Sequence, residues 1–504
     1  MSENLSKQVR FIKRAVRGKG GAVAAKNQAA AELGARILSE GGNAVDAAIA
    51  VAFALAVLEP WTCGLGSAGC MTIWDQEKHR GVVIDFPSAL PSQMFRSEPA
   101  WPGPAEGDKA KTNAIPRYRK IAVPGQPEGM WAAHLFGTKP WTALVAPAVE
   151  ISEEGLEFDW YAHLAIGLAA AELARSPASR DWFLPSNLPA SYLDAKLELR
   201  LRNPALTATL KLLAERGARD FYEGLIAYAL EDDLARGGSP ITKDDLRAYR
   251  ARVVEPDILS RGGKRYLLPP DGIMAETFCS LMKSDDHPPA NVDIKRMTDL
   301  AHAFSAAYAE LQRPGSEGGE WGSHVSVIDG IGNMASLSQS LGSLFGSRVV
   351  LSNTGILLND YAAEIGWQAA PNAGGGFAAH HLLPIVGLSG ERAWLALGVA
   401  GDRHVMPTLI QLISLLDDFG YSLEDAFHQP RISICKSGRV EVDATASPEI
   451  KSALSQIFRA HEVPAVLHPF ARPCAVAVCV DLFSGERVGI TEVTELWAGA
   501  AAVA

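Results

Sequence analysis

The sequence predicts a layered α/β protein, on the basis of two observations. Stretches rich in alanine and leucine at helical spacing dominate the first half of the chain, over 24–58 and 141–235. Short apolar segments typical of core strands recur in the second half, at 394–397 and 475–480. Helical segments combined with such strands are typical of proteins in which helices cover a sheet.

Local signals place several elements along the chain. Residues 24–58 are predicted to form an alanine-rich helix, a break at 41–43 and a second, buried helix, because glycine typically ends a helix. Thr242 is predicted to cap a helix that begins at the next residue. Residues 323–340 alternate in polarity around a glycine-rich turn at 329–333, which predicts a β-hairpin.

The composition excludes some classes of partner. Hydrophobic residues make up 48% of the 504 residues and charged residues 21%, as in an ordinary globular protein. The net charge of −10, from 47 basic and 57 acidic residues, argues against nucleic acid or an anionic membrane as the main partner. No apolar run reaches the ~18 residues that span a bilayer. We expect a small-molecule substrate, and the composition is compatible with a homo-oligomer.

The N-terminal segment and the cysteines indicate the compartment. Residues 1–19 carry six basic side chains with no apolar segment after them, unlike a secretory signal, so a cytoplasmic location is expected. The six cysteines form no CxxC pair and no zinc-ligand spacing. We expect reduced, mostly buried thiols and no cofactor.

Short sequence blocks follow one another in an order shared with a known family. They are GGNAVDAA at 41–48, LEP at 58–60, GLGSAG at 64–69, VPG at 123–125, GTKPW at 137–141, TGILLN at 354–359 and QPR at 429–431. Together they resemble the γ-glutamyltransferase (γ-glutamyltranspeptidase) family, from about residue 22 to about residue 490. The resemblance implies a four-layer αββα sandwich of the N-terminal-nucleophile hydrolase type.

The same resemblance divides the chain into an N-terminal extension (1–21), a region like the family's large subunit (22–321) and a region like its small, catalytic subunit (322–504). In the family, the chain is cut before a threonine, which then attacks with its own α-amine as base. Here that position is Gly322, which has no side chain. The linker that precedes it in the family is also much shorter here. We therefore expect an uncleaved chain whose two regions form one compact αββα unit.

Most positions that hold the substrate in that family differ here. The arginine that clamps the substrate carboxylate aligns with Pro87, and an asparagine that binds the substrate amine aligns with Gly342. In the oxyanion segment, at 398–404, one glycine is kept as Gly401. The second becomes Asp402, whose charge would oppose a developing oxyanion. These losses argue against standard γ-glutamyl transfer.

Ionisable side chains gather at and around these positions, five of them new relative to the family pattern (His380, His381, Asp402, Arg403 and His404), and we expect them to carry the chemistry. His324, His380 and His404 are the expected acid/base groups, because histidine titrates near neutral pH. The expected substrate-binding residues are Glu364, His381, Gly401, Asp402 and Arg403. The first hypothesis is an uncleaved enzyme that acts on a small carboxylate-bearing substrate by histidine-based acid/base or hydrolytic chemistry.

Three alternatives stay open. Histidines and carboxylates could hold a divalent metal, although His380 and His381 are adjacent and would face opposite sides of a strand. Ser323 could be the nucleophile of a γ-glutamyl hydrolase or amidohydrolase after cleavage shifted by one residue. Against this, Ser323 shares strand parity with Val325 and Val327, which are expected to face the core. The third alternative is an inactive binding or partner subunit.

Overall fold

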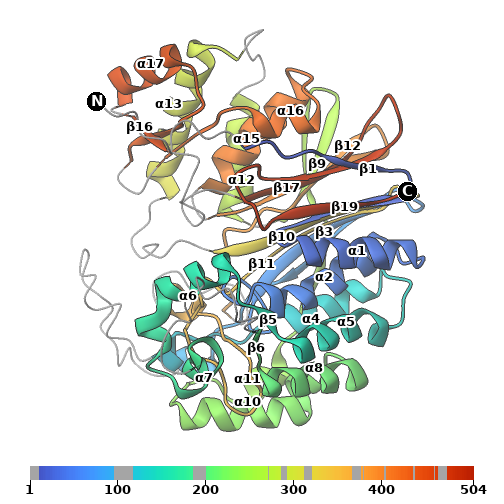
Figure 1. Cartoon of the computed structure of the whole chain (residues 1–504), viewed down its shortest axis with the longest axis vertical. Helices are drawn as coiled ribbons and strands as arrows, with labels where there is room; N and C mark the ends of the chain where they lie inside the picture. The colour runs from blue at the N-terminus through green and yellow to red at the C-terminus, as the bar shows by residue number, and fades with distance from the viewer. Residues whose placement is uncertain are drawn as a thin grey trace.

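Two seven-stranded sheets stack face to face, and helices cover both outer faces (Figure 1). The four-layer αββα sandwich implied by the family resemblance is therefore confirmed. The structure is a computed structural model that describes residues 11–95, 117–185, 200–270, 272–284, 292–311, 321–365, 376–378, 380–401, 404–434, 438–458, 460–463 and 474–504.

The first sheet combines strands from both ends of the chain. Its strands are β2 (Gly21–Ala25), β3 (Ala68–Asp75), β4 (Arg80–Phe86), β7 (Arg252–Val254), β10 (Gly322–Asp329), β11 (Met334–Ser340) and β19 (Gly499–Val503). They are ordered β19-β2-β10-β11-β3-β4-β7, and neighbouring strands are antiparallel. The predicted hairpin is confirmed as β10 and β11, which pair from Gly322 opposite Ser340 to Ile328 opposite Met334.

The second sheet is built from the N-terminal strand and from later segments. Its strands are β1 (Val16–Gly18), β8 (Asp257–Arg261), β9 (Lys264–Leu268), β12 (Ile385–Ser389), β13 (Arg392–Ala400), β17 (Cys474–Val480) and β18 (Arg487–Thr491). They are ordered β1-β18-β17-β13-β12-β9-β8. Two small sheets pair β5 (Leu156–Glu157) with β6 (Arg200–Leu201), and β14 (Ile432–Ile434) with β15 (Val440–Asp443) and β16 (His461–Val463).

The helices divide between the two outer layers (Figure 1). The layer on the first sheet contains α1 (Gln28–Ser39), α2 (Ala44–Leu58), α4 (Gln126–His134), α5 (Trp141–Glu154), α6 (Trp160–Leu173), α7 (Pro177–Phe183), α8 (Pro204–Arg216), α9 (Asp220–Glu223), α10 (Leu225–Arg236) and α11 (Lys243–Ala248). The layer on the second sheet contains α12 (Ile273–Ser284), α13 (Ile294–Leu311), α15 (Val405–Asp417), α16 (Leu423–His428) and α17 (Pro448–Phe458). The short elements are α14 (Tyr361–Ile365) and the 3-10 turns η2 (Ser92–Phe95) and η3 (Arg117–Lys120).

Successive side chains of a strand point to opposite faces of the sheet, so one strand contributes to two separate cores. Val325 and Val327 pack with α1 and α2, as their parity predicted, whereas Ile328 packs between the two sheets with Val476 of β17. One prediction was wrong at its boundary. Residues 24–25 belong to strand β2 rather than to a helix, because this segment pairs with β10 on one side and with the edge strand β19 on the other. Tertiary pairing there overrides the helical propensity of alanine.

The predicted helix cap is confirmed. Thr242 caps α11, where its hydroxyl accepts from Asp245 N at 3.2 Å. The five cysteines that the structure describes are thiols, and all but Cys279 are buried. Among the described helices, none is both long and apolar enough to cross a membrane.

Asp46 ties the start of α2 to the turn before α5. Its carboxylate is fully buried and accepts hydrogen bonds from Asn43 N, Thr138 N, Thr138 Oγ1 and Lys139 N. The Asp46→Ala variant leaves these donors without their acceptor, so we expect a loss of about 3 kcal/mol or more in the free energy of unfolding. Urea unfolding measures the loss. The Glu40→Ala variant, which changes an exposed residue, is the control. Equal stability of the Asp46→Ala and Glu40→Ala variants would contradict the prediction.

Candidate active site

Position 322, where β10 begins, is closely packed. Ser340 Oγ donates to Trp321 O at 2.8 Å, and Trp321 N donates to Gly342 O at 2.7 Å. A Cβ atom added to Gly322 would lie 2.9 Å from the carbonyl oxygen of Gln339, closer than side chains approach a backbone atom. The larger residue that the family places here would therefore require β11 to shift.

The peptide that joins Gly322 to Ser323 lies between two buried ionisable groups. Ser323 Oγ donates to Glu59 Oε2 at 3.4 Å, and Lys26 Nζ donates to the carbonyl oxygen of Gly322 at 3.3 Å. The exposed fractions of Ser323, Glu59 and Lys26 are 1%, 0% and 4%. A hydroxyl, a carboxylate and an ammonium group thus surround one peptide bond in the interior of the protein.

Burial sets the protonation of this cluster. It raises the pKa of Glu59 to about 7, although the Lys26 charge and hydrogen bonds from Ser323 and Thr62 act in the opposite direction. Burial also raises the pKa of the neighbouring Glu495 well above its ordinary range. Glu59 therefore titrates in the pH range where a general base is most effective.

His324 lies in the interior between the two sheets. Its ring packs directly against Gly398 of β13, where an added Cβ would lie 2.0 Å from the ring. Ser326 Oγ donates to Val476 O, so it accepts from His324 Nε2, while His324 Nδ1 lies 2.7 Å from Ser338 Oγ. Burial lowers the pKa of His324 to about 3. The ring is neutral and hydrogen-bonded at both nitrogens, and it packs between the two sheets. This structural role differs from the proton transfer that the sequence led us to expect from His324.

His380 belongs to a different network. Its Nε2 lies 3.2 Å from Asp85 Oδ1, and Arg252 Nε donates to the other carboxylate oxygen of Asp85 at 3.0 Å. Although burial acts in the opposite direction, the hydrogen bond from His380 and the Arg252 charge lower the pKa of Asp85. The neighbouring His381 is half-buried. Glu364 belongs to α14, and its side chain lies outside the described residues.

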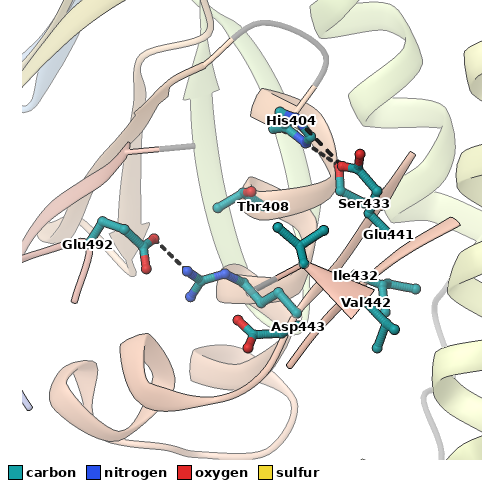
Figure 2. Close-up of a pocket in the computed structure, with 10 residues that line it drawn as sticks. His404, Thr408, Ile432, Ser433, Glu441, Val442, Asp443 and Glu492 are labelled. Atoms are coloured by element: carbon teal, nitrogen blue, oxygen red, sulfur yellow. Dashed lines mark hydrogen bonds and ion pairs between the residues drawn. The ribbon is translucent and has the colours of Figure 1, made fainter. Parts of the chain in front are cut away.

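His404 stands just before α15 and lines a pocket of its own (Figure 2). Its Nδ1 lies 2.5 Å from Ser433 Oγ, and its Nε2 lies 3.8 Å from Glu441 Oε2. Gly401 is buried with a φ of +143°, a conformation that favours glycine. The expected binding residues Asp402 and Arg403 lie outside the described residues.

The structure therefore does not gather the three expected catalytic histidines around one substrate. His324, His380 and His404 are hydrogen-bonded to Ser338, Asp85 and Ser433, which come from three different parts of the fold. Within the described part of the chain, no cluster of three or more histidine, cysteine, aspartate or glutamate side chains could hold a metal ion.

The sequence analysis missed Lys26 and Glu59. Lys26 directly follows the apolar strand β2, and Glu59 directly follows helix α2, which is apolar from Ala47 to its end. A charged residue at the end of an apolar element was the available signal. What the sequence could not supply was that both groups meet the first residues of β10.

The stacked sheets, with β10 at the centre of one of them, define the class of N-terminal-nucleophile hydrolases. The family model described as Gamma-glutamyltranspeptidase matches residues 30–271 and 291–485, so the chain belongs to this family.

Curated relatives and a solved structure agree with this assignment. The chain is 29% identical to the Acylase ACY 1 proenzyme of Pseudomonas sp. (strain SE83), with 90% of this chain and 88% of the relative covered. It is 26% identical to the Glutathione hydrolase proenzyme of Escherichia coli (strain K12), with 82% and 81% covered. The crystal structure of cephalosporin acylase from Bacillus halodurans superposes with a TM-score of 0.83 over 100% of this chain and 99% of that chain, at 23% identity. At this level of identity, the similarity to the cephalosporin acylase supports the fold alone.

Proposed function

We propose that this protein is an acylase-like amidohydrolase that cleaves its own chain between Gly322 and Ser323 and uses Ser323 as the N-terminal nucleophile. The observation that carries the proposal is the pair of buried groups at this bond, with Lys26 on the carbonyl oxygen and Glu59 on the serine hydroxyl. The relatives named as proenzymes support processing of the chain. The separate surroundings of the three histidines weigh against the uncleaved, histidine-based enzyme expected from the sequence.

The cleavage follows from the contacts of these groups. Ser323 Oγ attacks the carbonyl carbon of Gly322 and passes its proton to the Glu59 carboxylate. The Lys26 ammonium stabilises the negative charge that develops on the Gly322 oxygen. The C–N bond then breaks, the serine nitrogen takes the proton from Glu59, and an ester joins Gly322 to Ser323 Oγ. Water hydrolyses this ester, which leaves a Gly322 carboxylate and a free amine on Ser323.

Cleavage also prepares the site for a substrate. The new α-amine of Ser323 is a base beside its own hydroxyl, as in other N-terminal nucleophiles. Lys26 loses the peptide carbonyl of Gly322 as its acceptor and becomes the cation that receives a substrate oxygen. Because Gly342 stands where the family has the asparagine that binds the substrate amine, the proposed substrates are small acyl amides that carry a distal carboxylate but no amine beside it, rather than standard γ-glutamyl compounds.

Intact-mass spectrometry of the purified protein tests the proposal. We expect two chains, 1–322 and 323–504, with the second beginning Ser-His-Val-Ser. The processed protein should hydrolyse 4-nitroanilides of short dicarboxylic acids faster than γ-glutamyl-4-nitroanilide. One species of 53.8 kDa that persists through long incubation would overturn the proposed cleavage.

A further inference from the structure

The small sheet β14-β15-β16 has one polar face and one apolar face. Ser433 lies directly opposite Glu441 in the antiparallel pair, and Glu441 lies opposite His461 in the parallel pair. Residues aligned in this way project from the same face of a sheet. Ile432 and Val442 project from the other face into the core beneath the second sheet.

His404 covers this polar face from the start of α15, as Figure 2 shows for His404, Ser433 and Glu441. One ring nitrogen lies 2.5 Å from Ser433 Oγ, and the other lies 3.8 Å from Glu441 Oε2. A histidine between a hydroxyl and a carboxylate can accept the hydroxyl proton while the carboxylate stabilises the resulting imidazolium ion.

Arg431 supplies an unused donor in the same pocket. It is two residues before Ser433, so the two side chains leave the chain on the same face. Its Nη2 donates to Glu492 Oε2 at 2.5 Å, whereas its buried Nη1 has no hydrogen-bond partner among the residues that the structure describes. A buried guanidinium N–H without an acceptor is costly, and an oxygen atom of a ligand would satisfy it.

The pocket limits the size and charge of such a ligand. It has a volume of about 50 Å³ and is lined by Thr408, Val442 and Val463 as well as by the groups above. Glu441, Asp443 and Glu492 also line it, so a ligand with several negative charges would be repelled. A neutral ester with a short acyl group meets these requirements.

We propose that this pocket is a second hydrolytic site, specific for short-chain esters and independent of chain cleavage. Ser433 Oγ attacks the ester carbonyl carbon, and its proton passes to His404 Nδ1. Arg431 Nη1 donates to the carbonyl oxygen as it becomes negative. The bond to the leaving oxygen breaks, and His404 returns the proton to that oxygen. A water molecule then releases the acyl group from Ser433 and restores the serine hydroxyl through His404.

The test uses the Ser323→Ala variant as the parent protein, so that the proposed N-terminal nucleophile is absent. We expect the parent to hydrolyse 4-nitrophenyl acetate, and the added Ser433→Ala and His404→Ala substitutions each to reduce this rate by about 100-fold or more. Ser452→Ala, at an exposed serine on α17, is the matched control and should retain the parent rate. Circular dichroism confirms that each variant is folded.

Labelling provides a measurement that needs no substitution at the site. A fluorophosphonate probe should modify the parent at Ser433, as read by peptide mass spectrometry, and prior incubation with 4-nitrophenyl acetate should slow the labelling. No label at Ser433, or equal ester hydrolysis by the parent and the Ser433→Ala variant, would overturn the second site. Neither result depends on whether the Gly322–Ser323 bond is cleaved in the wild-type protein.

Discussion

The Ser323→Ala variant is expected to remain one chain of 53.8 kDa under conditions in which the wild-type protein separates into two. Alanine removes the attacking oxygen and, with it, the hydrogen bond from the buried hydroxyl to Glu59. We expect the cleavage rate to fall by at least about 1,000-fold. Intact mass measured over time after purification records the rate.

Two further variants test the specificity of this result. Ser326→Ala removes a buried hydroxyl from the opposite face of the same strand and should still be cleaved. Lys26→Met removes the ammonium group from the Gly322 carbonyl and should slow cleavage by about 100-fold to 1,000-fold. If the Ser323→Ala chain were cut at the same bond as the wild-type chain, Ser323 could not be the nucleophile.

Sequence reasoning succeeded where one element determines its own structure. The buried helix α2 and the hairpin of β10 and β11 follow from local periodicity and turn residues, and the family blocks predicted the stacking of four layers. The facing of Val325 toward the helices followed from the two-residue repeat of a strand. The same argument correctly placed Ser323 on the face of Val325 and Val327, but it counted against Ser323 as a nucleophile and did not reveal that the Glu59 carboxylate lies there.

The site was harder to predict because its groups come from separate elements. Glu59 ends α2, Lys26 ends β2, and Ser323 begins β10, so their meeting depends on the register between β2 and β10. Conversely, His324, His380 and His404 were grouped because they align with neighbouring positions of a family's active site. Each ring turns toward a partner on another segment, and alignment alone carries no information about the direction of a side chain.

The Glu59→Gln substitution should slow cleavage, and it should also change how the free energy of unfolding depends on pH. Glu59 must be ionised to accept the serine proton, so the wild-type cleavage rate should rise as pH increases through about 7 and then level off. Glutamine cannot accept that proton, and we expect cleavage to fall by about 100-fold or more with no such rise. Cleavage measured by intact mass from pH 5.5 to 8.5 tests this, and a pH-independent wild-type rate would contradict it.

The free energy of unfolding should fall as pH rises, whereas the cleavage rate should increase. A carboxyl pKa raised from 4.5 to about 7 favours the folded state below pH 4.5, and that contribution is lost as pH rises through 7. The loss corresponds to about 3 kcal/mol. Urea unfolding in the Ser323→Ala background should therefore show a smaller decrease in stability between pH 5 and pH 8.5 when residue 59 is glutamine. Equal decreases would mean that Glu59 is not the titrating group. The buried carboxylate thus destabilises the chain at the pH where it can act as a base, which is the expected cost of placing a general base in the interior of the protein.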